Sequence, residues 1–143
     1  AGIPDGTYDV VTLWEVLEHL PDPRGTLSAV RRTLKPQGLL ALSTPDAGSA
    51  VARILGRRWP GWSKIPEHLF FFDRSTTRRI LVEAGFHILS MRYVSLVVSW
   101  RYLLDRVGRV TGMPFHRHLP EAWLERSVKV NPLYDLMVLA RRN

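Results

Sequence analysis

The residues best suited to chemistry gather in one short stretch that contains Glu15, Glu18 and His19. Their spacing of i, i+3 and i+4 places all three on one face if the segment turns helically. Two carboxylates and an imidazole suit a divalent cation such as magnesium, and His68 could supply a fourth ligand from a loop. One hypothesis is therefore a metal site made of Glu15, Glu18, His19 and His68.

The two histidines also support a different chemistry. Neutral imidazole titrates in the range that a general base requires, so His19 or His68 could take the proton from a substrate hydroxyl. A third interpretation is structural: Glu15 and Glu18 cap nearby amides, and His19 packs under a loop. The residues alone leave these three interpretations open.

Composition limits the classes of protein that could carry this stretch. The chain has 143 residues and a mass of 16.4 kDa, room for one domain, with 45% apolar and 23% charged residues. These values exclude wholesale disorder, and no apolar run is long enough to span a bilayer. The absence of cysteine excludes disulfides, thiol nucleophiles and Cys-ligated zinc. With no signal-peptide pattern at the amino end, we expect a cytoplasmic protein.

The net charge of +7 is unevenly placed along the chain. Residues 1–73 hold 8 basic and 8 acidic residues, whereas residues 74–143 hold 12 basic and 5 acidic ones. A basic half can bind nucleic acid, an anionic lipid surface or an anionic substrate, and it can also be a merely solvated arginine-rich face.

Around the stretch that holds Glu15, Glu18 and His19, hydrophobic periodicity and turn signals predict alternating strands and helices. The predicted strands are Tyr8–Trp14, Leu39–Ser43, Phe86–Val94 and Tyr134–Ala140. The predicted helices are Arg24–Lys35, Gly48–Arg58, Ser75–Ala84 with Ser75 as its N-cap, Leu96–Val110 and Pro120–Ser127. This alternation predicts an α/β fold with a mostly parallel sheet. The helix over Leu96–Val110 is expected to pack over that sheet, and contact with a membrane surface is the alternative.

The first predicted strand is as apolar as a buried central strand, although it begins close to the amino end. An exposed edge on such a strand is avoided in natural proteins, so we expect something to cover it. A second copy of the chain, forming a homodimer through this edge, is the expected cover.

Several motifs together resemble a known family. They are Gly6–Pro23 with its Glu-x-x-Glu-His and Pro-Asp-Pro, Leu34–Gly38 before the strand ending Thr44-Pro45-Asp46, and Pro66–Asp73 before Glu83–Phe86. The chain resembles class I S-adenosylmethionine-dependent methyltransferases, in particular ubiquinone-biosynthesis O-methyltransferases, over residues 3–94 and again over residues 131–142. Gln37 stands where that family usually has glycine.

The resemblance implies the C-terminal half, strands 4–7, of a Rossmann-like seven-stranded sheet ordered 3-2-1-4-5-7-6 with the last strand antiparallel. Residues 1–143 would then be a single partial methyltransferase domain without the first three strand–helix units and the Gly-rich cofactor turn. Residues 95–131 would be a helical insertion before the last strand. The sequence indeed contains no Gly-x-Gly turn.

The resemblance also implies S-adenosylmethionine as cofactor, with Leu13, Trp14 and Glu15 beside it. The Glu-x-x-Glu-His stretch followed by a later histidine is locally similar to small-RNA 2′-O-methyltransferases, which keeps a magnesium site under consideration. The loop from Trp59 to Trp62, with Lys64, is a candidate lid over a planar or anionic acceptor.

The function implied is O-methylation of a small molecule or glycan precursor, and the 143-residue chain alone is expected to be inactive. The alternative is a non-catalytic half-domain that binds an anionic partner, either nucleic acid or a membrane surface. RNA methylation is a further option suggested by the arginine content, but no RNA-binding motif is present and nucleic acid is not the expected partner.

Overall fold

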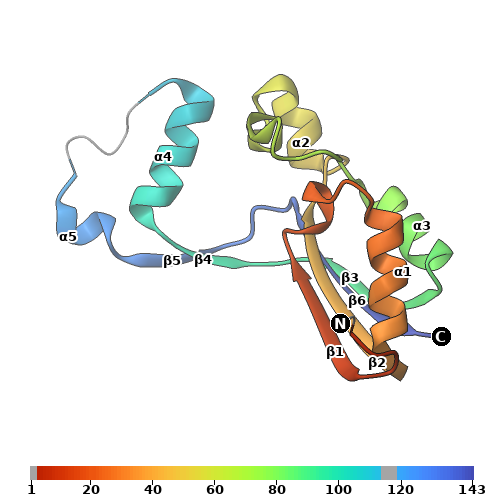
Figure 1. Cartoon of the computed structure of the whole chain (residues 1–143). Coiled ribbons are helices and arrows are strands. Elements are labelled where there is room, and N and C mark those ends of the chain that lie inside the picture. Colours follow the sequence, from red (N-terminus) through yellow and green to blue (C-terminus); the bar gives the residue numbers. More distant parts are fainter. Residues whose placement is uncertain (1–2, 114–118) are drawn as a thin grey trace.

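The computed structural model describes residues 3–113 and 119–143 (Figure 1). Its main body is a four-stranded sheet with the strand order β1-β2-β6-β3. These strands are β1 (Tyr8–Trp14), β2 (Leu34–Pro45), β3 (Phe86–Tyr93) and β6 (Asp135–Arg142). The helices associated with this body are α1 (Pro23–Thr33), α2 (Ala50–Leu55) and α3 (Arg74–Glu83), with short 3₁₀ turns η1 (Leu17–His19), η2 (Gly56–Arg58) and η3 (Pro60–Lys64).

Strand β6 runs antiparallel to both of its neighbours, whereas β1 and β2 are parallel to each other. The last strand of the chain is therefore inserted between β2 and β3. This order and direction confirm the expected arrangement 4-5-7-6 with an antiparallel last strand. The antiparallel direction has a consequence for the site, because it brings the amino end of β6 to the edge where β1 and β2 end.

The core lies between the sheet and the helices α1 and α3, which cover the same face (Figure 1). Alternation along β2 and β6 sends every second side chain into this layer. Helices α1 and α3 contribute leucines and isoleucine from their inward faces. The fully buried members include Leu27, Leu40, Leu42, Leu81, Phe86, Leu136 and Val138.

Local capping sets where α1 and α3 begin. The Asp22 carboxylate accepts from Gly25 N at 2.9 Å, with Pro23 in the first turn of α1. At α3 the cap is Asp73, which forms a reciprocal capping box with Thr76. The prediction that Ser75 caps this helix is therefore wrong, because the N-cap lies two residues earlier, at Asp73, and Ser75 lies inside the helix. Gly85, with φ of +84°, ends the helix as predicted.

Residues 96–130 form a separate lobe, drawn in cyan and blue in Figure 1. It contains β4 (Leu96–Ser99), α4 (Trp100–Thr111), α5 (Glu121–Leu124) and β5 (Ser127–Val130), and β4 pairs with β5 antiparallel. The segment expected as a helical insertion thus also holds a two-stranded sheet, and its residues 114–118 lie outside the described part. The helix expected over Leu96–Val110 is wrong in its first four residues, which are a strand, and α4 packs on β4 and α5 rather than over the main sheet.

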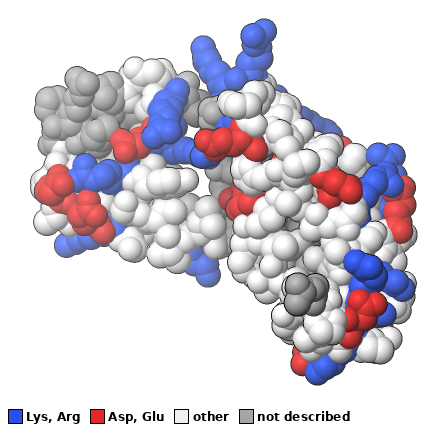
Figure 2. All heavy atoms as spheres, viewed as in Figure 1, with Lys and Arg blue, Asp and Glu red and all other residues white. Residues whose placement is uncertain are grey.

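In the view of Figure 2, acidic and basic side chains are interspersed over most of the surface, and basic side chains project at the upper edge above α2.

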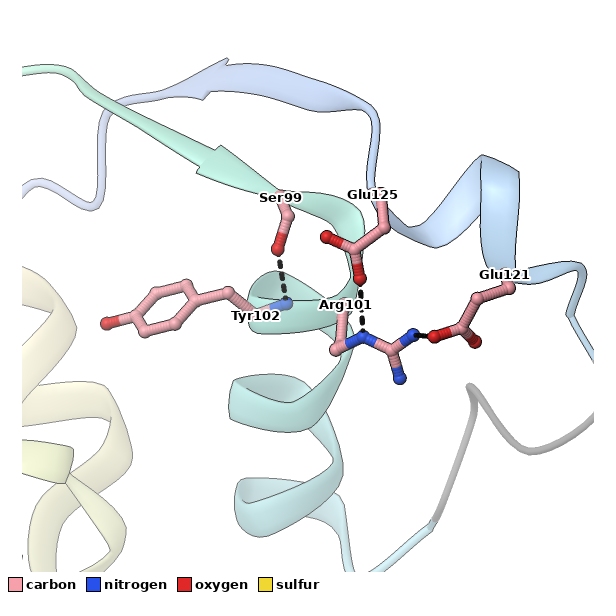
Figure 3. Close-up of polar contacts among 5 residues, drawn as sticks. All are labelled: Ser99, Arg101, Tyr102, Glu121 and Glu125. Carbon is pink, nitrogen blue, oxygen red and sulfur yellow. Dashed lines mark hydrogen bonds and ion pairs between the residues drawn. The ribbon is translucent and has the colours of Figure 1, made fainter.

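Within the lobe, Figure 3 shows Arg101 between Glu125, whose Oε1 lies 2.9 Å from its Nε, and Glu121, with which it also pairs. The Ser99 hydroxyl accepts from Tyr102 N at 3.2 Å and so caps α4. Stacking of Trp100 on Trp123 at 5.0 Å completes the link between α4 and α5.

Strand β1 lies at the edge of the sheet, with β2 as its one neighbour among the described strands. Val10 is 52% exposed and Trp14 is 50% exposed. The prediction of a buried first strand is therefore wrong in this structure, because the described residues place no element beside β1's free edge or over the face that carries Val10 and Trp14. None of the described helices is long and apolar enough to cross a membrane.

Candidate functional site

The candidate site lies at the carboxyl edge of the sheet. Strand β1 ends at Trp14 and leads through Glu15 into the 3₁₀ turn Leu17–His19, and the parallel strand β2 ends beside it. The loop that carries His68 is fastened to this turn, because the backbone N–H groups of Leu69 and Phe70 both donate to the Glu18 carbonyl, at 2.8 and 3.1 Å. Two segments about 50 residues apart are thereby held together, as Figure 1 shows for the ribbon.

The Glu18 side chain is 1% exposed and only half satisfied. Its Oε2 accepts from the Thr44 hydroxyl at 3.0 Å, whereas Oε1 is buried and has no partner among the described residues. Burial raises the pKa of this carboxyl, and the neighbouring Glu15 carboxylate adds to the rise, while backbone and Thr44 hydrogen bonds oppose it. A buried acceptor without a donor is uncommon, so this oxygen marks a place where a proton or a cation would be stabilising.

His19 and His68 meet edge to face, with ring centroids 4.7 Å apart. Nδ1 of His19 lies 2.7 Å from the Glu67 carbonyl oxygen. Because a carbonyl oxygen only accepts, Nδ1 must carry the hydrogen, which leaves the Nε2 lone pair of neutral His19 available. The pKa of His68 is lowered by burial and then by the nearby His19 and Lys64, so its neutral form is favoured.

The structure brings Glu18, His19 and His68 together, with one potential ligand atom from each lying within 4.8 Å of the others. Glu15 lies outside this cluster. Its backbone has φ of +51°, before the 3₁₀ turn begins, and its Oε1 accepts from the Ser43 hydroxyl at 2.6 Å. The predicted common face for Glu15, Glu18 and His19 is therefore not formed, because the helical turn starts only at Leu17.

The predicted cofactor residues occupy the last positions of β1. Leu13 is half-buried and packs against the core, whereas Trp14 faces the opposite side of the sheet and half of its surface is exposed. Glu15 follows at the edge itself, and its N–H donates to the Ser43 carbonyl at 3.2 Å. A large exposed aromatic surface at a carboxyl strand end fits a planar ligand, so these residues are compatible with a nucleoside beside them.

A cavity of about 150 Å³ lies beside the cluster, and both Glu15 and His68 line it. Its remaining polar lining includes residues that sequence reasoning missed, namely Tyr102 and Arg106 from α4 and Tyr134 and Asp135 from the start of β6. The Arg106 guanidinium donates to the Tyr134 hydroxyl at 3.3 Å. The sequence did hold a signal for two of them, because Tyr134 and Asp135 are polar residues at the beginning of the last strand. An antiparallel last strand begins at the edge of the sheet where β1 and β2 end.

Among the residues that line this cavity, Asp135 has a carboxyl group whose pKa lies well above its usual value. Burial, followed by repulsion from Glu15, raises its pKa to about 6, while the positive charge of Arg106 opposes the rise. Burial also raises the pKa of the Tyr134 hydroxyl, again opposed by Arg106. Groups with such shifts inside a cavity are frequent at functional sites, although ion-pair networks produce them as well.

The loop from Trp59 to Trp62, predicted as a lid, is packed against the body of the protein. Trp59 is 1% exposed and packs edge to face on Trp62 and Tyr134, with centroids 5.3 and 6.2 Å apart. Lys64 lines the small cavity. The loop thus forms a fixed wall of the site.

Comparison with known proteins shows where this architecture recurs. A family model described as a methyltransferase domain matches residues 2–91. A ubiquinone biosynthesis O-methyltransferase from Burkholderia ambifaria is 32% identical over 103 residues, which cover 62% of this chain and 44% of that protein. The protein of the same name from Photobacterium profundum is 26% identical over 129 residues, or 87% of this chain and 47% of that protein. The chain thus spans somewhat less than half the length of these relatives.

Solved structures give the same fold at low sequence identity. An S-adenosylmethionine-dependent methyltransferase from Archaeoglobus fulgidus matches with a TM-score of 0.59 and 17% identity, covering 98% of this chain and 62% of that one. A second, from Mesorhizobium loti, matches with a TM-score of 0.57 and 19% identity, covering 99% of this chain and 65% of that one. The four-stranded sheet with its inserted antiparallel strand is therefore part of a recurrent α/β architecture.

Proposed function

The chain belongs to the class I S-adenosylmethionine-dependent methyltransferases, and from that membership we propose that the protein methylates an oxygen atom of a small-molecule acceptor. The observation that carries the proposal is the convergence of Glu18, His19 and His68 at the carboxyl edge of the sheet, beside a cavity. Ligands of open α/β sheets bind outside this edge. The names of the relatives favour oxygen as the atom methylated, and a hydroxyl of a glycan precursor remains within the proposed acceptor class.

We propose that Leu13, Trp14 and Glu15 form the wall beside the methyl donor. Trp14 offers an exposed ring at the end of β1, and Glu15 offers a carboxylate at the same edge. When bound there, S-adenosylmethionine supplies an activated methyl group on sulfur. The protein's part is to hold the acceptor oxygen in line with that group and to exclude water from it.

Of the two predicted general bases, His68 has the better position. It lines the cavity, whereas His19 is not among the lining residues and its Nδ1–H is already engaged with a carbonyl. In the proposed step the acceptor oxygen forms a bond to the methyl carbon, the carbon–sulfur bond breaks, and the hydroxyl proton moves to the neutral imidazole of His68. His19 supports this role by packing against the His68 ring.

A metal ion at the same cluster is the alternative mechanism, and the unpartnered Glu18 Oε1 is the specific observation that favours it. Glu18, His19 and His68 would be its ligands, without the predicted Glu15. One carboxylate and two imidazoles suit manganese or zinc better than the magnesium first considered, because magnesium prefers oxygen ligands. A bound cation would lower the pKa of the acceptor hydroxyl directly and make a histidine base unnecessary.

The test is a methyl-transfer assay on the full-length natural protein that carries this sequence, with a panel of phenolic and sugar hydroxyl acceptors and release of S-adenosylhomocysteine as the readout. His68→Gln should lower the turnover number by about 10²-fold or more if His68 is the base. His87→Gln is the matched control, because His87 is exposed on β3 outside the site. Equal rates for wild type and His68→Gln would exclude the base.

Chelation separates the two mechanisms. Full activity after treatment with a chelator removes the metal alternative, whereas loss of activity that manganese restores removes the general-base step. The non-catalytic alternative predicts another result: no S-adenosylmethionine-dependent product with any acceptor, together with association with an anionic partner that weakens steeply as salt is raised.

A further inference from the structure

A second cavity, of about 310 Å³, lies next to the small one. It opens between the η2–η3 loop on one side and α4 on the other. Four of its seven lining residues are arginines, Arg57 and Arg58 from the loop and Arg106 and Arg109 from α4, and none is acidic. Arg106 and Arg109 stand three residues apart on one helix and therefore share a face.

Two buried donors of this lining lack an acceptor. Nε of Arg106 and Nε1 of Trp59 are both buried without a hydrogen-bond partner among the described residues. Buried donors are normally satisfied, and leaving them unpaired destabilises the folded state. Arg57, Arg58 and Arg109 are exposed, whereas Nε of Arg106 does not reach solvent. An oxygen-rich ligand in the cavity would place acceptors beside the side chains that carry these two nitrogens, since Trp59 and Arg106 both line it.

The charges around the cavity favour an anion. None of the ion pairs found in residues 3–113 and 119–143 involves its four arginines. Arg106 does interact electrostatically with Asp135, and it donates to the Tyr134 hydroxyl, on the side that faces the small cavity. The guanidinium groups of the other three arginines have no carboxylate within ion-pair distance in that part of the chain. Planar guanidinium forks match the oxygens of phosphate in pairs.

The two cavities adjoin, because Pro60 and Arg106 line both of them. A ligand could therefore place one end near His68 and the other among the arginines. The larger cavity has room for a diphosphate and part of the group attached to it. Trp62, partly exposed, offers a flat apolar surface for that attached group.

We propose that this arginine cavity binds a phosphate or diphosphate group of the methyl acceptor, while the acceptor's hydroxyl reaches His68 in the adjoining cavity. The acceptor class is thus a phosphorylated small molecule. The binding of the anionic group stands on the cavity alone, and only its assignment to the acceptor rests on the proposed methyltransferase function. Arg57, Arg58, Arg106 and Arg109 would fix the orientation of the acceptor rather than take part in methyl transfer.

The experiment is isothermal titration of the full-length protein with inorganic pyrophosphate, at physiological salt and without S-adenosylmethionine. We expect saturable binding with one site per chain, and at least about tenfold weaker binding in the double variant Arg58→Gln/Arg109→Gln. The control Arg78→Gln/Arg92→Gln removes the same charge from exposed positions on α3 and β3 and should change the affinity less than about twofold. Equal losses in both variants, or no saturable binding, would overturn the proposal.

Two further arms identify the source of the phosphate. Phenyl phosphate should compete with pyrophosphate if the ligand is a phosphorylated small molecule. Binding to phosphatidylglycerol vesicles that needs Arg58 and Arg109, without binding of either soluble phosphate, would overturn the acceptor assignment in favour of a membrane surface. Pyrophosphate binding as expected in a protein that transfers no methyl group would leave the anion site standing and refute only the proposed function.

Discussion

Asp135 and Glu18 are two carboxyl groups that the fold keeps partly out of water at the same edge of the sheet. Burial raises the pKa of both, and for Asp135 the value reaches about 6. Each group therefore takes up a proton more readily in the folded state than it would in water. A site with protonatable carboxyls near His68, whose lowered pKa favours the neutral imidazole, can rearrange protons as an acceptor hydroxyl or a cation enters.

The first prediction concerns Asp135 and the pH dependence of stability. The pKa of Asp135 in the folded state is raised above the usual 3.8. Its contribution to the free energy of unfolding should therefore be greatest at low pH and be lost as the pH rises from about 4 through about 6. Asp135→Asn should flatten this fall. Chemical denaturation at a series of pH values measures it, with Asp5→Asn, an exposed carboxyl, as control. An unchanged slope in Asp135→Asn would contradict the assigned burial effect.

At the scale of single elements, capping decides where α3 starts and so how the loop carrying His68 enters the core layer. The Asp73 carboxylate accepts from Thr76 N at 2.7 Å, and Thr76 Oγ1 accepts from Asp73 N at 2.8 Å. These bonds satisfy backbone donors that the first helical turn leaves open. They also lower the pKa of Asp73 below its usual value.

The second prediction tests this cap. Asp73→Ala should lower the free energy of unfolding by about 1 kcal/mol, since it removes the side-chain half of the capping box. Ser75→Ala, which leaves the backbone partners of Asp73 intact, should change it by less than about 0.5 kcal/mol. Thermal or chemical denaturation measures both. A larger effect at Ser75 than at Asp73 would restore the cap expected from the sequence.

At the scale of the whole molecule, the sheet ends in an edge that the described residues do not cover. Val10 and Trp14 of β1 are about half exposed, and the outer backbone groups of this strand face no described neighbour. Natural proteins protect such edges by pairing, charge or a covering element. The carboxyl end of the same strand carries the proposed cofactor wall, so whatever covers β1 also lies beside the proposed site.

The third prediction is that the 143-residue chain self-associates through β1. Sedimentation at micromolar concentration should show a dimer, and Val10→Lys should shift it toward monomer, because a charge on an edge strand opposes pairing. Val97→Lys is the control, since Val97 is also exposed but lies on β4. A stable, folded wild-type monomer at that concentration would exclude this assembly.

The fourth prediction is that the 143-residue chain by itself binds S-adenosylmethionine weakly, with a dissociation constant well above the micromolar range. The described residues offer one wall, Leu13 to Glu15, and the sequence has no Gly-x-Gly turn to bring backbone close to the ligand. A ligand held on one side stays largely hydrated. Titration calorimetry measures the constant, and tight binding or methyl transfer by this chain alone would refute the prediction.

The sequence by itself determined the elements whose signals are local. Apolar runs, Asp22-Pro23 and Gly85 were enough to predict β1, α1, α3 and β3, because strand alternation, caps and left-handed turns depend on residues a few positions apart. The motifs of Gly6–Pro23 and Pro66–Asp73 also identified the family, and with it the place of the antiparallel last strand. The candidate cluster was found from the same short stretch, in so far as Glu18, His19 and His68 do meet.

Only the tertiary structure decided what depends on distant partners. Leu96–Ser99 has helical spacing but is a strand, because it pairs with Ser127–Val130 about 30 residues later. The positive φ of Glu15 removes its side chain from the histidines, and no local pattern announced it. Arg106 and Asp135 reach the site from α4 and β6, since the antiparallel strand returns its amino end to the edge where β1 stops. The burial of Asp135 in the small cavity follows from that return.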